Sequence, residues 1–474
     1  MRNRKKTKIV ATLGPACDTK EIIEEMMTAG VNVFRVNFSH ANYKNVAEKI
    51  KIIRKINKKR GYNVAILADL QGPKLRVGVM AEKVKLKKGA TFTFTTKKCD
   101  GTQEKAFMTY LKFPQDVKVG EYILVDDGKL LFEVTSTDGK TEVVTKVLRG
   151  GKLKSKKGVN LPNTDISLPA LTEKDREDAL FAIKMEADWI ALSFVRYAQD
   201  LIDLRELITE HSDFRIPIIA KIEKPEAVEN ISDITAYCDG LMVARGDLGV
   251  EVPMEEVPLI QKRLVLEAKK ARIPVIIATQ MMETMITSQV PTRAEVNDVA
   301  NSVMDGADAV MLSGETSIGE FPLEVIQKIR SIIESVEDSP LIIMTESHIQ
   351  SINERFISKT ICHHAAIVAG DIEATVISTL TNSGYTAFQI SSWRPKSHIL
   401  AFSSNKRILT MLNLLWGVTA HYYDKRISTD DTVIDINKIA FEKGYAKAND
   451  YVVNLTAMPL HKKGMVNTLR VTQI

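Results

Sequence analysis

Short runs of apolar, mostly β-branched residues recur eight times in the first two thirds of the chain, and a helical pattern follows most of them. The runs lie at 7–13, 31–37, 63–70, 189–195, 216–222, 240–246, 274–280 and 309–315. Runs that are apolar nearly throughout are typical of strands buried on both faces of a parallel sheet. Eight such strands alternating with helices predict an α/β fold built on a (β/α)8 TIM barrel.

Several helix starts can be located from the residues that precede a helical pattern. In each of three cases, an N-cap residue is followed three positions later by an acid, so that the two can bond each other's backbone N–H groups. These pairs are Asp18 with Glu21, Thr172 with Asp175, and Thr292 with Glu295.

The alternation breaks between the third and fourth strands. Residues 73–168 are rich in Thr, Val, Lys and Gly, with hairpin signals at Asp127-Gly128 and Asp138-Gly139. This stretch predicts an inserted all-β domain, a small β-barrel. Because it leaves the main barrel at the carboxyl end of a strand, we expect it to act as a lid over the active-site face.

A third unit follows from about residue 341. Its strand candidates lie at 375–381, 398–404, 418–424, 450–457 and 467–474, with helical patterns between most of them. We therefore predict a separate three-layer α/β domain at the C-terminus. The expected domains are residues 1–72 and 169–340 for the barrel, 73–168 for the lid and 341–474 for the C-terminal domain.

Composition excludes several classes of protein. With 65 Lys and Arg against 59 Asp and Glu, the net charge of +6 is small for 474 residues, and no nucleic-acid-binding motif accompanies it. No apolar run approaches the ~18 residues that span a membrane, and no secretory signal is recognisable. The four cysteines form no CxxC pair, so we expect a reducing, cytoplasmic compartment. P-loop, GxGxxG and GxSxG motifs are also missing from the sequence.

Polar and charged residues gather where the predicted strands end, which in a barrel is the face that holds the active site. Glu223 and Asp247 end adjacent strands, and two carboxylates completed by substrate oxygens and water suit Mg2+. The alternative is that they form salt bridges with Lys221 and Arg245. Since both carboxylates lie on neighbouring strands, we favour the metal site.

Other strand ends suggest anion binding. Lys221 shares a strand face with Glu223 and could neutralise a phosphoryl group or enolate, and Arg35 offers a planar fork for phosphate. For each, a rim ion pair is the alternative. Asn37, Ser39 and Asp69 could ligate a monovalent cation or phosphate oxygens, although Ser39 could instead cap a helix.

The segment from Thr381 to Thr386 follows a strand and opens a helix in the C-terminal unit. Its hydroxyls and free N–H groups could cradle a phosphate, or Ser383 could simply be an N-cap. In the last loop, Lys462 or Lys463 could reach the same phosphate.

These residues closely resemble the pyruvate kinase family over nearly the whole chain. Eight segments support the resemblance, in the family's order: TKIVATLGP at 7–15, RVNFSH at 35–40, GVNLP at 158–162, IIAKIE at 218–223, VARGDLGVE at 243–251, ATQMME at 278–283, PTRAE at 291–295 and MLSGET at 311–316. The family's barrel, β lid and C-terminal regulatory domain match the layout predicted above.

The resemblance implies transfer of a phosphoryl group from phosphoenolpyruvate to ADP, giving pyruvate and ATP in the final step of glycolysis. It implies the following roles: Glu223 and Asp247 as Mg2+ ligands, with Mn2+ as an alternative ion; Lys221, Arg35 and Thr279 as catalytic; Gly246, Asp247 and Thr279 as binders of the substrate carboxylate; and Asn37, His40, Arg76 and Lys157 as the nucleotide side. It also implies a cytoplasmic homotetramer.

The same family binds phosphorylated effectors in its C-terminal domain. The resemblance therefore implies an effector site at Thr381, Asn382, Ser383, Gly384 and Thr386, for a sugar phosphate or AMP. The last loop lacks the family's usual Gly-rich start, so the nature of the effector stays open.

One departure from the family is informative. Its common motif DTKGPEIR is DLQGPKLR at 69–76 here, so Lys74 replaces a glutamate. Many members need K+, held by groups matching Asn37, Ser39 and Asp69. Because the ammonium of Lys74 brings a fixed positive charge, we predict that K+ is not required. The combination of Leu70, Gln71 and Lys74 resembles one branch of the bacterial members of the family.

Two other functions fit parts of this pattern. A Mg2+-dependent enolate lyase or aldolase would share Glu223, Asp247 and Lys221 but would not need Arg76, Lys157 or a lid. A degenerate member kept as a sugar-phosphate sensor would not need Lys221 and Thr279 intact.

Overall fold

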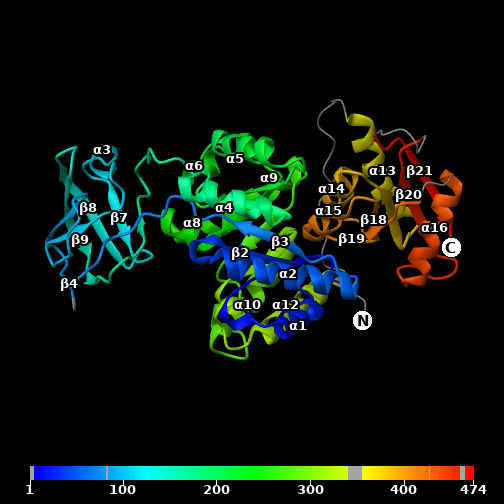
Figure 1. Ribbon diagram of the computed structural model, residues 1–474, viewed down its shortest axis with the longest axis horizontal. Coiled ribbons are helices and arrows are strands. Elements are labelled where there is room, and N and C mark those ends of the chain that lie inside the picture. Colours follow the sequence, from blue (N-terminus) through cyan, green and yellow to red (C-terminus); the bar gives the residue numbers. More distant parts are fainter. Residues whose placement is uncertain (1–4, 82–83, 340–354, 426–427, 459–464) are drawn as a thin grey trace.

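The computed structural model describes residues 5–81, 84–339, 355–425, 428–458 and 465–474. Figure 1 shows three parts in a row, with the segment inserted after β3 at one end, a barrel in the middle and the C-terminal α/β part at the other end. The inserted and C-terminal parts therefore contact opposite ends of the barrel.

Each of the eight predicted runs contains a strand, and these strands close a parallel barrel in the order β1-β16-β15-β14-β13-β12-β3-β2. They are almost entirely buried, as their apolar sequences require. The strands are β1 (Lys8–Thr12), β2 (Val33–Asn37), β3 (Ala65–Asp69), β12 (Trp189–Leu192), β13 (Ile218–Ile222), β14 (Gly240–Ala244), β15 (Val275–Ala278) and β16 (Ala309–Leu312).

Four of these strands end two or three residues earlier than the sequence predicted. After Leu192 and Ala278 the chain passes through left-handed residues, Phe194 at φ 55° and Thr279 at φ 69°. After Ala244 and Leu312 it turns into short helices, α8 (Arg245–Glu251) and α11 (Gly314–Ser317). The predictions ran too far because these residues are held by contacts with distant parts of the chain, which local apolarity does not encode.

Helices cover the outside of the barrel (Figure 1). They are α1 (Lys20–Ala29), α2 (Tyr43–Arg60), α4 (Glu173–Lys184), α5 (Ala198–His211), α6 (Pro225–Glu229), α7 (Ile231–Tyr237), α9 (Val257–Ala271), α10 (Arg293–Asp305) and α12 (Pro322–Glu337), with 3-10 turns at η1 (Pro15–Cys17), η2 (Phe38–His40), η3 (Met254–Glu256) and η4 (Glu283–Ile286). The capping boxes predicted at Thr172 and Thr292 are confirmed. At α1 the prediction was wrong by one residue, because Thr19 rather than Asp18 is the N-cap and accepts from Ile22 N.

The inserted part is a six-stranded sheet in the order β11-β7-β8-β9-β5-β6 beside a two-stranded sheet of β10 and β4. Both predicted hairpins are present, at the β7–β8 and β8–β9 turns. Bridges from Arg76 to Gly158 and from Val77 to Met108 place the incoming chain between the two edges of the larger sheet. Its elements are β4 (Lys85–Leu86), β5 (Thr91–Thr95), β6 (Lys105–Phe107), α3 (Phe113–Asp116), β7 (Tyr122–Val125), β8 (Leu130–Thr137), β9 (Glu142–Arg149), β10 (Gly151–Lys152) and β11 (Val159–Asn160).

The C-terminal part has a sheet in the order β19-β18-β17-β20-β21, antiparallel at β20–β21 and parallel elsewhere. All five predicted strands are present. Its elements are α13 (Phe356–Asp371), β17 (Val376–Leu380), α14 (Tyr385–Ser392), β18 (His398–Ser403), α15 (Lys406–Met411), η5 (Leu412–Leu414), β19 (Val418–Tyr422), α16 (Thr429–Glu442), β20 (Tyr451–Thr456) and β21 (Thr468–Gln473).

The C-terminal part docks on the barrel at the end where the strands begin. Trp189 Nε1, in β12, donates to the carbonyl of Met411 at 3.0 Å, and Lys8 Nζ, in β1, donates to the carbonyl of Val418 at 2.8 Å. The ammonium of Lys6 lies 4.9 Å from the Trp416 ring. Apolar residues of the barrel interior and of this docking face share one buried cluster.

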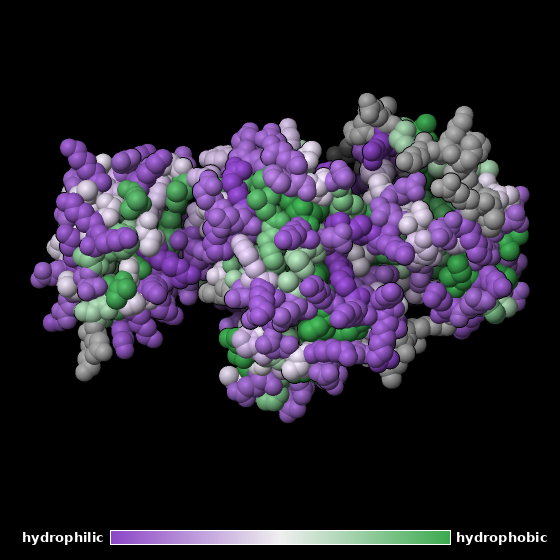
Figure 2. Space-filling view, in the orientation of Figure 1, coloured by the Kyte–Doolittle hydropathy of each residue, from purple (hydrophilic) through white to green (hydrophobic). Residues whose placement is uncertain are grey.

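Figure 2 shows a largely hydrophilic face on the inserted part, with apolar side chains gathered over the centre of the molecule. Within the described part of the chain, the helices are too short or too polar to cross a membrane.

Candidate active site

Four side chains from β2, β3 and the end of β13 form a buried charge network at the carboxyl end of the barrel, where β12 separates β3 from β13. Arg35, in β2, donates through Nε to Asp69 Oδ2 at 2.6 Å and through Nη1 to Thr12 Oγ1 at 3.1 Å. Asp69 Oδ1 lies 3.1 Å from Lys221 Nζ, which lies 3.0 Å from Glu223 Oε1. The structure thus brings together four of the predicted residues, with alternating charges.

The network is enclosed by protein. Asp69 and Glu223 are each 1% exposed, Lys221 is 8% and Arg35 is 9%. Burial acts against the charged forms, but Asp69 and Glu223 outweigh it at Lys221 and raise the pKa of its ammonium. Burial would raise the pKa of Asp69, but the charges of Lys221 and Arg35 outweigh it and hold that pKa below its ordinary value. Lys221 is therefore a permanent cation.

Two residues after β12 complete the network, and the sequence analysis did not single them out. Lys221 Nζ donates to Ser193 Oγ at 2.6 Å, and Ser193 Oγ donates in turn to the carbonyl of Leu70 at 2.7 Å. The backbone N–H of Phe194 donates to Glu223 Oε2 at 2.8 Å. Both residues lie near the end of the fourth predicted strand, 189–195, so the inspection of strand ends was the signal that could have found them.

A second group of contacts fixes the start of α8. The N–H of Gly246 donates to Thr279 Oγ1 at 2.7 Å, which joins two predicted carboxylate-binding residues. Arg245 donates through both terminal nitrogens to Asp298, at 2.7 Å each, and through Nη2 to the carbonyl of Thr279 at 2.8 Å. The predicted alternative to a metal site was a pair of salt bridges to Lys221 and Arg245. The bridge between Lys221 and Glu223 is present. Arg245 does not pair with Asp247 and turns toward α10 instead.

Glu223 and Asp247 fit a divalent cation. Burial and the neighbouring negative charge of Asp247 raise the pKa of Glu223 against the opposing effect of Lys221. A cation held between the two carboxylates would remove that repulsion. Among the described residues, no group of three or more His, Cys, Asp or Glu side chains is gathered for a metal. The protein thus offers two carboxylates, which leaves positions for substrate and water, as Mg2+ sites usually do.

A pocket of about 70 Å3 separates this rim from the inserted part. It is lined by Lys74 and Asn160 on one side and by Lys224, Asp247 and Glu251 on the other. Asn160 Nδ2 donates to Glu251 Oε1 at 2.8 Å, and Lys224 Nζ lies 2.8 Å from the same oxygen. The inserted part is therefore bonded directly to the end of α8. Lys224, Glu251 and Asn160 were also missed, because they meet only in the folded chain.

The remaining predicted residues lie around this centre. Asn37 is the N-cap of η2, and its Oδ1 accepts from Ser39 N at 3.1 Å. Ser39 lies inside this turn and is therefore not a helix cap. The backbone of His40 lies in η2, and its side chain is outside the described part. Arg76 Nη1 donates to the carbonyl of Lys156 at 2.9 Å, and Lys157 pairs with Asp126 at 2.6 Å, both within the inserted part.

In the C-terminal part, the predicted effector residues form the turn between β17 and α14. The N–H of Gly384 donates to Thr381 Oγ1 at 2.9 Å, and Gly384, at φ 85°, is the N-cap of α14. Ser383 is therefore not the cap, and both it and Asn382 are exposed. Thr386 is buried in the first turn of the helix. Lys462 and Lys463 lie outside the described residues.

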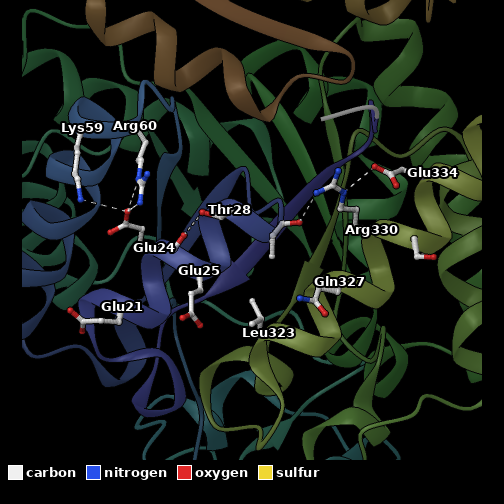
Figure 3. A pocket seen from close by; sticks show the side chains of 12 residues that line it. Glu21, Glu24, Glu25, Thr28, Lys59, Arg60, Leu323, Gln327, Arg330 and Glu334 are labelled. Atoms are coloured by element: carbon white, nitrogen blue, oxygen red, sulfur yellow. Dashed lines mark hydrogen bonds and ion pairs between the residues drawn. The ribbon is translucent and has the colours of Figure 1, made fainter. Parts of the chain in front are cut away.

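A larger hollow, of about 690 Å3, lies on the outer surface between α1, the end of α2 and α12 (Figure 3). Its charges are mostly paired within the chain: Arg60 and Lys59 both reach Glu24, and Arg330 pairs with Glu334 at 2.9 Å. None of the predicted site residues lines it. Its size alone therefore does not mark the active site.

A closed (β/α)8 barrel with a buried charged network at the carboxyl ends of its strands defines the class of barrel enzymes. Comparison with known proteins narrows this class. The family model described as pyruvate kinase, barrel domain, matches residues 4–326, and the pyruvate kinase alpha/beta domain matches residues 359–472. The chain belongs to the pyruvate kinase family.

Individual relatives agree with the family models. The chain is 41% identical to a pyruvate kinase of Geobacillus stearothermophilus over 478 residues, covering 99% of this chain and 80% of the relative. It is 40% identical to the pyruvate kinase of Bacillus licheniformis, covering 98% and 80%. A crystal structure of a pyruvate kinase from Cryptosporidium parvum superposes with a TM-score of 0.91 at 32% identity, covering 99% and 96%.

Proposed function

We propose that this pyruvate kinase transfers the phosphoryl group of phosphoenolpyruvate to ADP, giving pyruvate and ATP. The observation that carries the proposal is the buried network of Arg35, Asp69, Lys221 and Glu223, beside Asp247. Phosphoryl transfer needs little covalent help from a protein and depends on positioning and on neutralising charge in a dry site. A lyase or aldolase is less well supported, because the inserted part and its bond to α8 would have no task.

In this proposal the ammonium of Lys221 stabilises the phosphoryl group while it passes from phosphoenolpyruvate to ADP. Asp69, Glu223 and Ser193 hold its ammonium in place, so no reorganisation is needed when charge develops. Arg35 uses Nε for Asp69 and Nη1 for Thr12, and we propose that its remaining nitrogen, Nη2, faces the phosphate.

The substrate carboxylate would bind at the start of α8. There, Gly246 N–H and Thr279 Oγ1 are already bonded to each other, and both could turn to a carboxylate. Glu223 and Asp247 would hold Mg2+, or Mn2+ in its place, and the ion would supply charge neutralisation on the substrate oxygens. Thr279, through water, would orient the proton that reaches the enolate carbon.

The nucleotide would lie between the barrel rim and the inserted part. We propose Asn37 and His40 on the barrel side and Arg76 and Lys157 on the other. Arg76 and Lys157 belong to the part that is bonded to α8 through Asn160. Movement of the inserted part toward the rim would bring these cations to the phosphates of ADP and exclude water.

The test is turnover of phosphoenolpyruvate with ADP and Mg2+, followed through lactate dehydrogenase. We expect activity in the unaltered chain and a loss of at least ~100-fold in kcat for Lys221→Met, because a buried charge aimed at the reacting group is removed. Lys438→Met removes an exposed lysine on α16 that pairs with Glu442 and should leave kcat unchanged. Full activity in Lys221→Met, or no ATP formed by the folded wild-type protein, would reject the proposal.

We further propose that K+ is not required. Lys74 is exposed at the pocket that also contains Asp247, so a fixed ammonium stands near the reaction centre. Activity should be similar in KCl and in tetramethylammonium chloride, and Lys74→Glu should make the enzyme dependent on K+. A strict K+ requirement in the wild-type protein would contradict this.

A phosphorylated effector is proposed for the turn of Thr381, Asn382, Ser383, Gly384 and Thr386, where exposed polar groups precede α14. A screen of AMP, sugar monophosphates and sugar bisphosphates as activators tests it, and a flat response to all would reject it.

We also propose the domain limits 72/73, 168/169 and 340/341, the last of which lies outside the described residues. A homotetramer of about four times 52.9 kDa and a cytoplasmic location are proposed too, and light scattering and cell fractionation test them.

A further inference from the structure

A small cavity lies at the junction between the barrel and the C-terminal part, at the opposite end of the barrel from the active site. Its walls come from both parts: Lys269, Arg272 and Asp308 belong to the barrel, and Ser392 and Arg394 to the C-terminal part. Its volume is about 10 Å3, which suits a single water molecule or a monatomic ion. In Figure 1, α14 and α15 lie on this face, next to the barrel.

The charges around the cavity do not balance. Lys269, Arg272 and Arg394 contribute three positive charges, and Asp308 is the one carboxylate among the lining residues. That carboxylate is already engaged, because Oδ2 accepts from Arg394 Nη2 at 2.8 Å and from Val275 N at 3.0 Å. Among the lining residues, two positive charges are therefore in excess of the single carboxylate.

Arg394 also has unused donors. Its side chain is 5% exposed, and Nη2 donates to the carbonyl of Gly306 and to Asp308. Its Nε and Nη1 have no hydrogen-bond partner among the described residues. Burying unpaired N–H groups of a charged side chain is unfavourable, so the geometry calls for an acceptor at this point.

Each of the other two cations makes a single hydrogen bond within the described part of the chain. Lys269 Nζ donates to the carbonyl of Asp305 at 3.0 Å, which leaves two of its three N–H groups without a hydrogen-bond partner among the described residues. Arg272 Nη1 donates to Ser392 Oγ at 2.9 Å, and its guanidinium lies 3.7 Å from the Trp393 ring. Burial lowers the pKa of Lys269, and the nearby Arg394 lowers it further. Water would satisfy N–H groups here, but only an anion would also offset the charge.

We propose that this cavity binds a small inorganic anion of the size of chloride, held between Lys269 of the barrel and Arg394 of the C-terminal part. Since the two cations belong to different parts of the molecule, the bound anion would strengthen the docking of one on the other. A tetrahedral oxyanion such as phosphate is too large for a one-molecule cavity, so the site should discriminate between the two.

The test compares thermal unfolding of the full chain in sodium chloride, sodium gluconate and sodium phosphate at constant ionic strength. We expect chloride to raise the unfolding temperature saturably. Phosphate can stabilise the chain through the active site and the effector turn, so any rise that it causes should be the same in the wild-type protein and in Lys269→Met. Lys269→Met should weaken half-saturation by chloride at least tenfold. Lys270→Met changes the neighbouring lysine, which is exposed and paired with Glu267, and should retain the chloride response.

Bromide provides a direct readout, because its anomalous scattering locates it in a crystal. The expected peak lies within hydrogen-bond distance of Arg394 Nε or Nη1 in wild-type crystals and is missing from Lys269→Met crystals. A bromide peak without any chloride effect in solution would mean an adventitious ion only and would overturn the proposal. So would an equal chloride response in Lys269→Met, or a response to phosphate that Lys269→Met weakens.

Discussion

At the scale of single residues, the active-site rim concentrates backbone conformations that L-residues rarely adopt. Phe194, Thr279 and Gln280 have φ values of 55°, 69° and 54°. Each such residue costs about 1–2 kcal/mol and persists only where its surroundings hold it. At Phe194 this conformation accompanies the bond from its N–H to Glu223, and at Thr279 the carbonyl and hydroxyl are both bonded to the start of α8. The unfavourable backbone thus serves the contacts that the chemistry uses.

Gly72 packs against Phe194, one of these residues, and against Ser193. A methyl group at Gly72 would approach the Phe194 ring to 2.8 Å and Ser193 Cβ to 3.0 Å, at φ 71°. We expect Gly72→Ala to displace both residues and to lower kcat at least ~10-fold, a change of about 1.4 kcal/mol in the barrier. Gly61→Ala is the matched control, because Gly61 has φ 69° and open space around it. Equal kcat values in the two variants would show that Ser193 and Phe194 do not position Lys221 and Glu223.

At the scale of elements, α8 is held at both ends. Its first residue, Arg245, is bonded to Asp298 of α10, and its last, Glu251, is bonded to Lys224 and to Asn160 of the inserted part. The two residues proposed to bind substrate, Gly246 and Asp247, lie between these anchors. The short helix therefore connects the metal and carboxylate site to the barrel wall and to the inserted part.

Asp298→Ala should release the first anchor. Arg245 is 11% exposed and would lose the partner of its charge, so we expect α8 to shift and kcat/KM for phosphoenolpyruvate to fall ~10-fold or more. Asp305→Ala removes another carboxylate of α10, one that pairs with the exposed Lys262, and serves as the control. Unchanged steady-state kinetics in Asp298→Ala would mean that the other contacts of α8 suffice.

Helix α8 illustrates which features could be predicted from the sequence and which could not. The strands were predictable because a strand buried on both faces must be apolar, and Thr172 and Thr292 were predictable as caps because a capping box is local. The start of α8 was not predictable. Arg245 directly follows an apolar run, and the helix begins there because Asp298, far along the chain, pairs with its guanidinium. Lys221 and Glu223 could be placed on one face by spacing alone, whereas Ser193 and Lys224 acquire their roles through contacts between elements.

At the scale of the whole molecule, the buried cores divide unequally. The inserted part has a core of its own, around Phe92, Phe94 and Phe132. The C-terminal part instead shares a buried cluster with the barrel interior, in which Trp189 packs near Phe388. A change in the stability of the C-terminal part should therefore reach the barrel more directly than a change in the inserted part.

Acid provides such a change. Burial lowers the pKa of His421, in β19, to about 4, from an ordinary value near 6.5. Above about 6.5 the histidine is neutral in both states, and between 6.5 and 4 only the unfolded chain takes up the proton. The free energy of unfolding should thus decrease as the pH falls through this window, by up to about 3 kcal/mol.

Unfolding temperatures measured by circular dichroism between pH 4 and pH 7 test this. His421→Gln should flatten the dependence on pH relative to the wild-type protein. Thr419→Val, on the same strand, introduces no titratable group and should leave the dependence as it is. The same slope in His421→Gln would assign the acid sensitivity to other groups.

The junction between the barrel and the C-terminal part also has an optical consequence. The chain contains three tryptophans, and all of them lie at this junction: Trp189 bonds to Met411, Trp393 stacks on Arg272, and Trp416 lies between Lys6 and Arg394. The tryptophan emission of the protein, excited selectively over that of its 11 tyrosines, therefore comes entirely from the joint between these two parts. Without any added label, its wavelength and quenching report how the C-terminal part sits on the barrel and stay silent about the inserted part.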